Sequence, residues 1–329
     1  MPAGNRTRAP KGVPQGNRMT IDATKGIAGL KGALRYVRAY RDNVFVVKLG
    51  GDVVADREAL DGIAGQLGLL SSLGIRIVAV HGGGPQATAI SRRLGHEPTI
   101  VAGRRVTDDT ALEVAKMVYA GTLNVNLLAA LRSHGVQAVG LSGVDADLIT
   151  ARRRPPVNVV DDQGTSRTVD YGHVGDIERV DPHVVTALLG SRLLPVVASL
   201  AGDAEGEVYN VNADTVAEAL AVALAAQKLI FLTGAPGVLR DRGDPSSLVT
   251  FADPDDLADL MASGAIAGGM RPKVEACIRA ATGGVERTHI IDGRQPDSLL
   301  YEVFTGAGCG TMIVGRKEKA TYLGVDLAT

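Results

Sequence analysis

The sequence is poor in aromatic residues and in cysteine. Aromatic residues make up 3% of the 329 residues and Trp is absent, so a stacking platform for single-stranded nucleic acid is not expected. The two cysteines, Cys277 and Cys309, are too few for a disulfide framework or a four-thiolate zinc site. We expect both to be idle thiols in a reducing, cytoplasmic compartment.

An excess of one charge and long apolar runs are also missing. The chain has 35 Lys and Arg against 36 Asp and Glu, and this balance argues against a nucleic-acid partner. No uninterrupted apolar run reaches about 18 residues, so no membrane-spanning helix is expected. Residues 1–20 carry positive charges but lack the apolar region of a secretory signal. We expect them to form a disordered leader.

Glycine is abundant, with 41 residues, and short apolar runs alternate with helical patterns. Residues 21–43 place apolar side chains near helical spacing, which predicts an amphipathic helix. The alternation of strand and helix patterns begins at residue 44, and the polar segment 150–180 predicts inserted β-hairpins. This order predicts an α/β fold, a three-layer αβα sandwich around a central, mostly parallel sheet.

Glycines follow three of the predicted strands, at Gly50-Gly51, Gly82–Gly84 and Ser142-Gly143. Ligands of parallel sheets bind beyond the carboxyl ends of the strands, and glycine lets an anion approach backbone N–H groups. One such turn needs no functional explanation, but several on one sheet favour an anion pocket. Neither GxxxxGK[ST] nor GxGxxG is present, which argues against a P-loop and a nicotinamide site.

Two lysines lie where a cation is costly without a nearby anion. Lys48 ends a buried strand, and Lys273 lies in the first turn of a helix, where the helix dipole disfavours it. Asn210, Asn212 and Asp214 precede an Ala-rich helix and supply more polar groups than one cap needs. The six histidines form no HExxH motif. The pattern favours charge neutralisation over proton transfer, as in phosphoryl transfer.

Motifs spread over residues 44–314 resemble those of the acetylglutamate kinases, a group of the amino-acid kinase family. The motifs are VVKLGG (46–51), AVHGGGPQ (79–86), GRRVTD (103–108), AVGLSGVD (138–145), YNVNADTVA (209–217), LIFLTGAPGVL (229–239), GGMRPKVEA (268–276) and HIIDGR (289–294). The resemblance implies transfer of the ATP γ-phosphate to the γ-carboxylate of N-acetyl-L-glutamate in arginine biosynthesis. Mg²⁺ would arrive with ATP rather than on a side chain.

The resemblance also implies two lobes and a role for each site residue. Residues 44–200 would bind the acyl amino acid, residues 201–315 would bind ATP, and residues 316–329 would form a tail. Lys48 and Lys273 would stabilise the transferring phosphoryl group, with Asp214 orienting both lysines. The substrate would be held by Gly83, Gly84, Arg105, Asn210 and Asn212. The nucleotide would be held by Gly50, Gly51, Thr233, Gly268, Gly269 and Met270.

The N-terminal helix resembles that of arginine-inhibited members of the family, in which such a helix interlaces dimers into a hexamer. The resemblance extends to a regulatory arginine site made by Tyr36, His289, Glu302 and Gly308. It therefore implies inhibition by L-arginine and a homo-oligomer, a dimer or a hexamer built through the helix. It neither requires nor excludes a regulator of the PII type.

Several positions depart from the family pattern: Asp52, Val125, Val144, Ala146 and Gly234. They leave the phosphoryl-transfer residues intact but leave the acceptor open. N-succinylglutamate and a carrier-linked aminoadipate are the alternatives. A non-catalytic regulatory homologue is a further alternative, against which the two lysines and the carboxylate argue.

Overall fold

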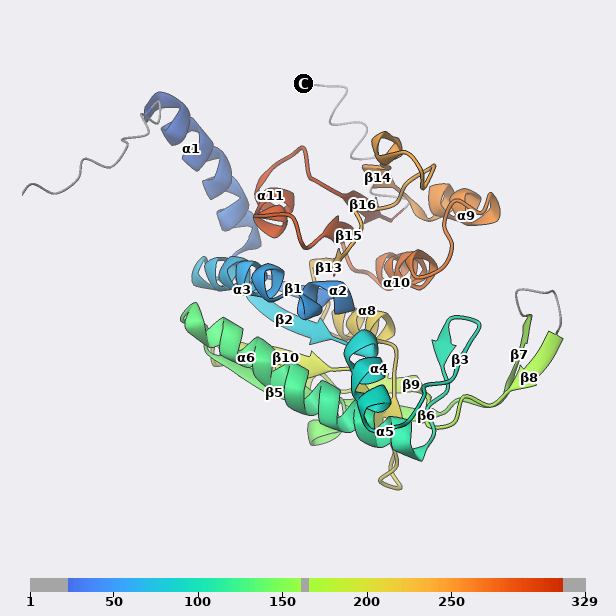
Figure 1. The fold of residues 1–329 in the computed structure, drawn as a ribbon. Helices are drawn as coiled ribbons and strands as arrows, with labels where there is room; N and C mark the ends of the chain where they lie inside the picture. Colours follow the sequence, from blue (N-terminus) through green and yellow to red (C-terminus); the bar gives the residue numbers. More distant parts are fainter. Residues whose placement is uncertain (1–22, 161–165, 316–329) are drawn as a thin grey trace, which may run out of the picture.

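The computed structural model describes residues 23–160 and 166–315, whose elements form three layers (Figure 1). The middle layer is an eight-stranded sheet in the order β14-β16-β15-β13-β1-β2-β10-β5. The strands are β1 (Val44–Leu49), β2 (Arg76–His81), β5 (Ala138–Ser142), β10 (Leu194–Ala198), β13 (Lys228–Thr233), β14 (Phe251–Ala252), β15 (Arg287–Asp292) and β16 (Thr311–Val314). Neighbouring strands are parallel except β15 and β16. The predicted mostly parallel sheet is confirmed.

Helices cover both faces of this sheet, as predicted. One face is covered by α1 (Ala23–Tyr40), α2 (Gly51–Ala55), α3 (Arg57–Ser72), α4 (Gly84–Arg93), α5 (Asp109–Ala115), η1 (Lys116–Leu123), α6 (Asn124–Ser133) and α11 (Ser298–Phe304). The other face is covered by α7 (His183–Gly190), α8 (Ala213–Ala223), α9 (Pro254–Ala262) and α10 (Met270–Thr282). The predicted leader and tail lie outside the described residues.

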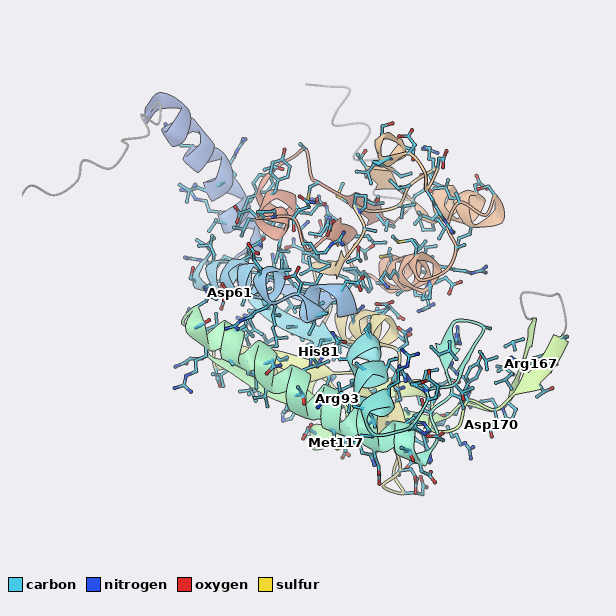
Figure 2. The ribbon with its side chains drawn as sticks, viewed as in Figure 1. Asp61, His81, Arg93, Met117, Arg167 and Asp170 are labelled. Carbon is cyan, nitrogen blue, oxygen red and sulfur yellow. The ribbon has the colours of Figure 1, made fainter. Side chains whose placement is uncertain are left out.

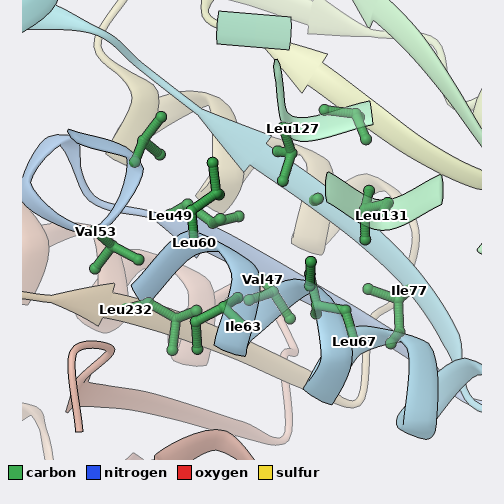
Figure 3. Packing of buried hydrophobic residues seen from close by; sticks show 14 of the residues in the cluster. Val47, Leu49, Val53, Leu60, Ile63, Leu67, Ile77, Leu127, Leu131 and Leu232 are labelled. Atoms are coloured by element: carbon green, nitrogen blue, oxygen red, sulfur yellow. The ribbon is translucent and has the colours of Figure 1, made fainter. Parts of the chain in front are cut away.

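The alternation of side chains along β1 divides the core between these two helical layers. Val47 and Leu49 pack with Ile63 and Leu67 of α3 (Figure 3). Val46 lies on the opposite face, in the cluster that contains α8 and α10. Each fully buried side chain of this kind contributes about 1.5–3 kcal/mol relative to exposure. The same alternation places Lys48 on the face of α8 and α10.

The order of strands reverses at β1. This strand pairs with β2 on one side and with β13 on the other. In an open parallel sheet such a reversal leaves a crevice beyond the carboxyl ends of the strands. The turns that follow these strands begin at Gly50, Gly82 and Gly234. The glycine turns predicted from the sequence therefore meet at one edge of the sheet.

The predicted insertion at 150–180 contains β-hairpins. Within it, β7 and β8 pair as a hairpin, and β6 and β9 pair in a second sheet of order β12-β11-β6-β9. Outside it, β3 and β4 form a separate hairpin. The β7–β8 hairpin, near the labelled Arg167 and Asp170, projects from the body (Figure 2). The bounds are β3 (Ile100–Val101), β4 (Arg104–Arg105), β6 (Ile149–Arg153), β7 (Val157–Val160), β8 (Ser166–Val169), β9 (Gly175–Val180), β11 (Leu200–Gly202) and β12 (Val208–Asn210), with short turns η2 (Asp145–Asp147) and η3 (Pro245–Ser247).

The long helix predicted over 110–133 is present as Asp109–Ser133, but its middle part, η1, is a π-helix. By length and composition this helix could cross a membrane. In the described chain it instead packs Val118, Leu127 and Leu131 into the core against the sheet. π-Helical turns are rare in proteins. Those that do occur are frequently found at functional sites.

Candidate active site

A buried carboxylate joins two ammonium groups beyond the carboxyl end of the sheet. Oδ1 of Asp214 lies 2.8 Å from Nζ of Lys48, and Oδ2 lies 3.1 Å from Nζ of Lys273. The side chains of Lys48 and Asp214 are each 7% exposed, and that of Lys273 is 20% exposed. The structure therefore brings together the three residues predicted to be catalytic.

Local structure explains why these three side chains converge. Lys48 faces α8 and α10 because it alternates with Val46 along β1. Asp214 lies in the first turn of α8, where Oδ1 of Asn212 caps the helix and accepts from the backbone N of Asp214 across 2.7 Å. Lys273 lies in the first turn of α10, and its Nζ also donates to the carbonyl of Gly269 across 3.2 Å.

Electrostatics keep the cluster poised for an anion. Burial lowers the pKa of the Lys48 ammonium; Asp214 opposes this shift and Lys273 adds to it. Burial raises the pKa of Asp214, but the two ammonium groups outweigh this effect and the net pKa is lowered. An ionised carboxylate between two ammonium groups leaves one positive charge in excess. Fixed positive charge of this kind stabilises a transferring phosphoryl group.

The cluster borders a cleft of about 710 Å³. The five residues predicted to bind substrate all line it: Gly83, Gly84, Arg105, Asn210 and Asn212. Nη2 of Arg105 donates to the carbonyl of Gly84 across 2.9 Å and also to Oγ1 of Thr88. Nδ2 of Asn210 donates to Oγ1 of Thr107 across 3.1 Å. A guanidinium group and an amide therefore lie on the walls of the same cleft.

Gly83 lies against the π-helical segment. A Cβ atom there would lie 2.4 Å from Cδ1 of Leu123 and 2.7 Å from Cδ1 of Tyr119. No side chain fits at this position, whereas a Cβ atom at Gly84 would meet nothing within 4 Å. Tyr119 also lines the cleft, as do Arg154 and Asp176. Sequence reasoning missed Tyr119 and Asp176, because no local motif marks them, whereas the charge run that ends at Arg154 favours a solvated face over a role in holding an anion.

The residues predicted to hold the nucleotide lie at three places: Gly50 and Gly51 follow β1, Thr233 ends β13, and 268–270 lead into α10. Gly51 lines the cleft, whereas Gly50, Thr233 and 268–270 lie outside its described lining. The backbone N of Gly50 donates to the carbonyl of Leu232 across 2.8 Å. Oγ1 of Thr233 accepts from the backbone N of Ala235 across 3.0 Å, within the following turn. Their contact with a nucleotide stays a prediction.

A second pocket, of about 400 Å³, lies among α1, β15 and α11. The four residues predicted for the regulatory site all line it: Tyr36, His289, Glu302 and Gly308. Lys228, which the sequence analysis missed, lies there too. Its Nζ is 3.0 Å from Nε2 of His289, and Nδ1 of His289 is 2.7 Å from Oε1 of Glu302.

These contacts form a directed chain of hydrogen bonds from Lys228 through His289 to Glu302. Burial lowers the pKa of His289 to about 4 and that of Lys228 to about 7. Burial raises the pKa of Glu302, but the interactions with His289 and the hydrogen bonds from Cys309 together outweigh burial and lower it to about 2. The imidazole is therefore neutral near pH 7 and accepts from one neighbour while it donates to the other.

The departures from the family pattern lie outside the ion pairs that join Lys48, Asp214 and Lys273. A Cβ atom at Gly234 would lie 2.9 Å from Oδ2 of Asp52, so the extra carboxylate fills the space beside this glycine. Asp52 faces the charge of Arg294 and of Lys48. Ala146 has a φ of 51°, in the left-handed region that favours glycine. Val125 and Val144 have exposed side chains.

Comparison with known proteins agrees with this geometry. Residues 43–292 match the model of the amino acid kinase family. The chain is 52% identical over 288 residues to the acetylglutamate kinase of Myxococcus xanthus, covering 87% of this chain and 94% of that one. It is 44% identical over 281 residues to the acetylglutamate kinase of Methanothrix thermoacetophila, covering 85% and 96%.

A solved structure provides a more distant likeness. The N-acetylglutamate synthase from Neisseria gonorrhoeae, solved in complexes with coenzyme A and either N-acetyl-glutamate or L-arginine, is 29% identical with a TM-score of 0.74. In the complex with N-acetyl-glutamate, the match covers 88% of this chain and 63% of the solved chain. The chain belongs to the amino acid kinase family, and within it to the acetylglutamate kinases.

Proposed function

We propose that the chain transfers the γ-phosphoryl group of ATP to the γ-carboxylate of N-acetyl-L-glutamate, giving N-acetyl-L-glutamyl 5-phosphate in arginine biosynthesis. The observation that carries this proposal is the carboxylate of Asp214 between the ammonium groups of Lys48 and Lys273, at the border of the cleft. Phosphoryl transfer depends on positioning and charge stabilisation more than on proton transfer. The named function of the relatives supports the same reaction.

The polar groups of the cleft suit a dicarboxylate that carries an amide. The guanidinium of Arg105 would bind the α-carboxylate through paired N–H groups. Asn210 would bind the acetamido group, and Asn212, whose oxygen caps α8, would lie beside it. The N–H groups of Gly83 and Gly84 would face the γ-carboxylate. The α-carboxylate, the acetamido group and the γ-carboxylate of the substrate would thus each meet a different polar group of the cleft.

The cationic cluster also suits the phosphates of ATP. Lys48 and Lys273 would hold oxygens of the transferring group, while Gly51, Thr233 and 268–270 would lie along the nucleotide. ATP supplies the phosphoryl group, and Mg²⁺ would shield the charge of its phosphates. Across residues 23–160 and 166–315, no group of three or more His, Cys, Asp or Glu could hold a metal ion. We propose that Mg²⁺ arrives with the nucleotide.

Release of ADP tests which acceptor the chain uses. The assay compares kcat/KM for N-acetylglutamate, N-succinylglutamate, glutamate, aspartate and aminoadipate with ATP and Mg²⁺. We expect N-acetylglutamate to exceed every other acceptor at least about tenfold, because an unmet polar group costs about 1–3 kcal/mol. Preference for another acceptor would reassign the substrate. Release of no ADP with any acceptor would favour a carrier-linked substrate or a non-catalytic homologue.

Replacing Arg105 by lysine tests the contact with the α-carboxylate. We expect KM for N-acetylglutamate to rise about 30-fold with kcat changed less than threefold, because lysine keeps the charge but loses the paired donors. The exposed Arg93 of α4 (Figure 2) gives the control variant Arg93→Lys, for which neither constant should change. An unchanged KM in Arg105→Lys would remove this residue from the substrate site.

We also propose that the second pocket binds L-arginine and inhibits the enzyme. The pocket offers a carboxylate, Glu302, for a guanidinium, and two cations, Lys228 and Arg287, for a carboxylate. Tyr36 of α1 joins the same pocket, so a bound amino acid would contact both the helix and the body. The complex of a relative with L-arginine supports this assignment.

Glu302→Gln removes the negative charge of this pocket while it preserves the shape of the side chain. We expect the arginine concentration for half-maximal inhibition to rise at least about tenfold, because a charged hydrogen bond contributes about 1.5–3 kcal/mol. The exposed Glu113 gives the control variant Glu113→Gln, which should keep the wild-type sensitivity. Equal sensitivity of both variants, or a wild type insensitive to millimolar arginine, would contradict the proposal.

We also make proposals for the assembly and the location of the chain. The helix α1 projects from the body (Figure 1) and packs into the core through Tyr36 and Tyr40 near its end, whereas Leu34 is exposed. We propose that α1 joins dimers of the chain into a hexamer, and that the protein is soluble and cytoplasmic. A regulator of the PII type stays a prediction from the resemblance alone.

A further inference from the structure

His81 ends β2, directly before the glycine turn of the cleft, and is fully buried. Its Nδ1 lies 2.9 Å from the carbonyl oxygen of Gly82, and its Nε2 lies 3.3 Å from Nδ2 of Asn124. Figure 2 labels it near the end of the strand. Val80 packs toward α8 and α10, so the alternation of the strand turns His81 to the opposite face. The ring therefore supports the turn from the side away from Lys48.

These contacts admit one neutral tautomer of the ring. A carbonyl oxygen only accepts, so Nδ1 carries the proton and donates to Gly82. Nδ2 of Asn124 also lies 3.2 Å from the carbonyl oxygen of Val196 and 3.4 Å from that of Leu141, which identifies it as the amide nitrogen. The amide nitrogen only donates, so Nε2 of His81 can meet it only as an acceptor, sharing its two hydrogens with the two carbonyls. Burial lowers the pKa of His81, which agrees with a neutral ring.

The hydrogen bond to Gly82 sets the direction of the next N–H group. In a planar trans peptide, the C=O and N–H groups point in opposite directions. Since the carbonyl of Gly82 points to the buried ring, the N–H of Gly83 points away from it, on the side of the cleft that Gly83 lines. Within the two described stretches, 23–160 and 166–315, no acceptor is found for the N–H of Gly83 or Gly84. These donors are free to meet an oxygen in the cleft.

Packing alone does not orient this peptide. Tyr119 and Leu123 lie against Gly83 and limit where its Cα can lie, but they offer no donor to the carbonyl of Gly82. Glycine rotates about its backbone bonds more freely than any other residue. The hydrogen bond from His81 is therefore the polar contact that selects one orientation of the Gly82–Gly83 peptide.

We propose that His81 is a positioning residue for the phosphoryl transfer: its Nδ1–H holds the carbonyl of Gly82 and so aims the N–H of Gly83 at the reacting oxygen. Asn124 holds the ring in the required tautomer. This inference rests on the proposed kinase function and assigns a task to a side chain that lies outside the cleft lining. Because an oriented donor acts most where charge develops, its loss lowers kcat more than it raises KM.

Asparagine and leucine at position 81 form a matched pair. They have nearly the same size and branching, but Nδ2 of asparagine can take the place of Nδ1 of the ring, whereas leucine has no donor. We expect His81→Leu to lower kcat about 30- to 100-fold with KM for both substrates within about threefold. His81→Asn should stay within about fivefold of the wild-type kcat. Equal losses in both variants would show a purely structural role and overturn the proposal.

Nitrogen NMR of the full-length wild type tests the geometry without relying on folding of a variant. The proposal requires that, at pH 7, Nδ1 of His81 is protonated and Nε2 is not. The reverse tautomer, or a charged ring, would overturn it. An active wild type with the wrong tautomer would contradict the role of His81 alone. A wild type that forms no ADP with any acceptor would overturn the reaction and, with it, the role that depends on it.

Discussion

Replacing Lys48 by methionine is expected to lower kcat about 10³-fold. The ammonium group of Lys48 is buried and lies 2.8 Å from the carboxylate of Asp214, at the border of the cleft. Removing one fixed donor to a developing charge typically costs about 10²–10³ in kcat, and a buried ammonium group belongs at the upper end. Methionine keeps the length and apolar stem of lysine, so the space stays filled.

Folding of Lys48→Met should survive, because Asp214 keeps its ion pair with Lys273. Steady-state kinetics and thermal unfolding measured on the same sample separate the two effects. The exposed Lys116 of η1 gives a matched control, since Lys116→Met removes the same charge away from the cleft. A folded Lys48→Met enzyme within tenfold of the wild-type kcat would contradict the assigned role.

The second large effect is expected from Asp214→Asn, which leaves Lys48 and Lys273 without the carboxylate between them. We expect kcat to fall about 10³-fold, because mutual repulsion would move the two ammonium groups from the positions that the transfer requires. Loss of one partner of a buried ion pair also destabilises a fold by about 3 kcal/mol. The measurements are steady-state kinetics and urea unfolding.

The exposed Asp259 of α9 gives the control Asp259→Asn, which should change neither quantity. A stable Asp214→Asn protein with near wild-type kcat would show that the lysines need no carboxylate to orient them. The double variant, which combines Asp214→Asn with Lys48→Met, tests whether the two residues act as a unit. Because groups that act as a unit lose their effects non-additively, adding Lys48→Met to Asp214→Asn should cost much less than a further 10³-fold.

Much of this site could be predicted from residues that violate local expectations. Lys48 at the end of an apolar strand and Lys273 in a first helical turn are each unfavourable alone. The fold resolves both oddities with one carboxylate, which lies 59 residues from Lys273 in the sequence. The apolar pattern of β1 and the cap of α8 are local, and so the strands and helices that carry these side chains could be predicted from the sequence.

Contacts that depend on long-range packing could not be predicted in this way. The periodicity of residues 110–133 indicates a helix but does not distinguish a π-helical turn, so the wall that η1 makes at Gly83 was missed. His81 and Asn124 lie 43 residues apart, and Lys228 and His289 lie 61 apart. The spacing of the residues in the sequence therefore does not predict either contact. Each becomes visible once the sheet brings its strands and helices together.

Trapping the product with hydroxylamine shows directly whether the chain phosphorylates a carboxylate. An acyl phosphate reacts with hydroxylamine to give a hydroxamate, which mass spectrometry can identify and locate. With ATP, Mg²⁺ and N-acetylglutamate, we expect the γ-hydroxamate of N-acetylglutamate from the wild type and almost none from Lys48→Met. ADP release from the wild type without any hydroxamate, or equal yields from both proteins, would contradict transfer to the carboxylate by this cluster.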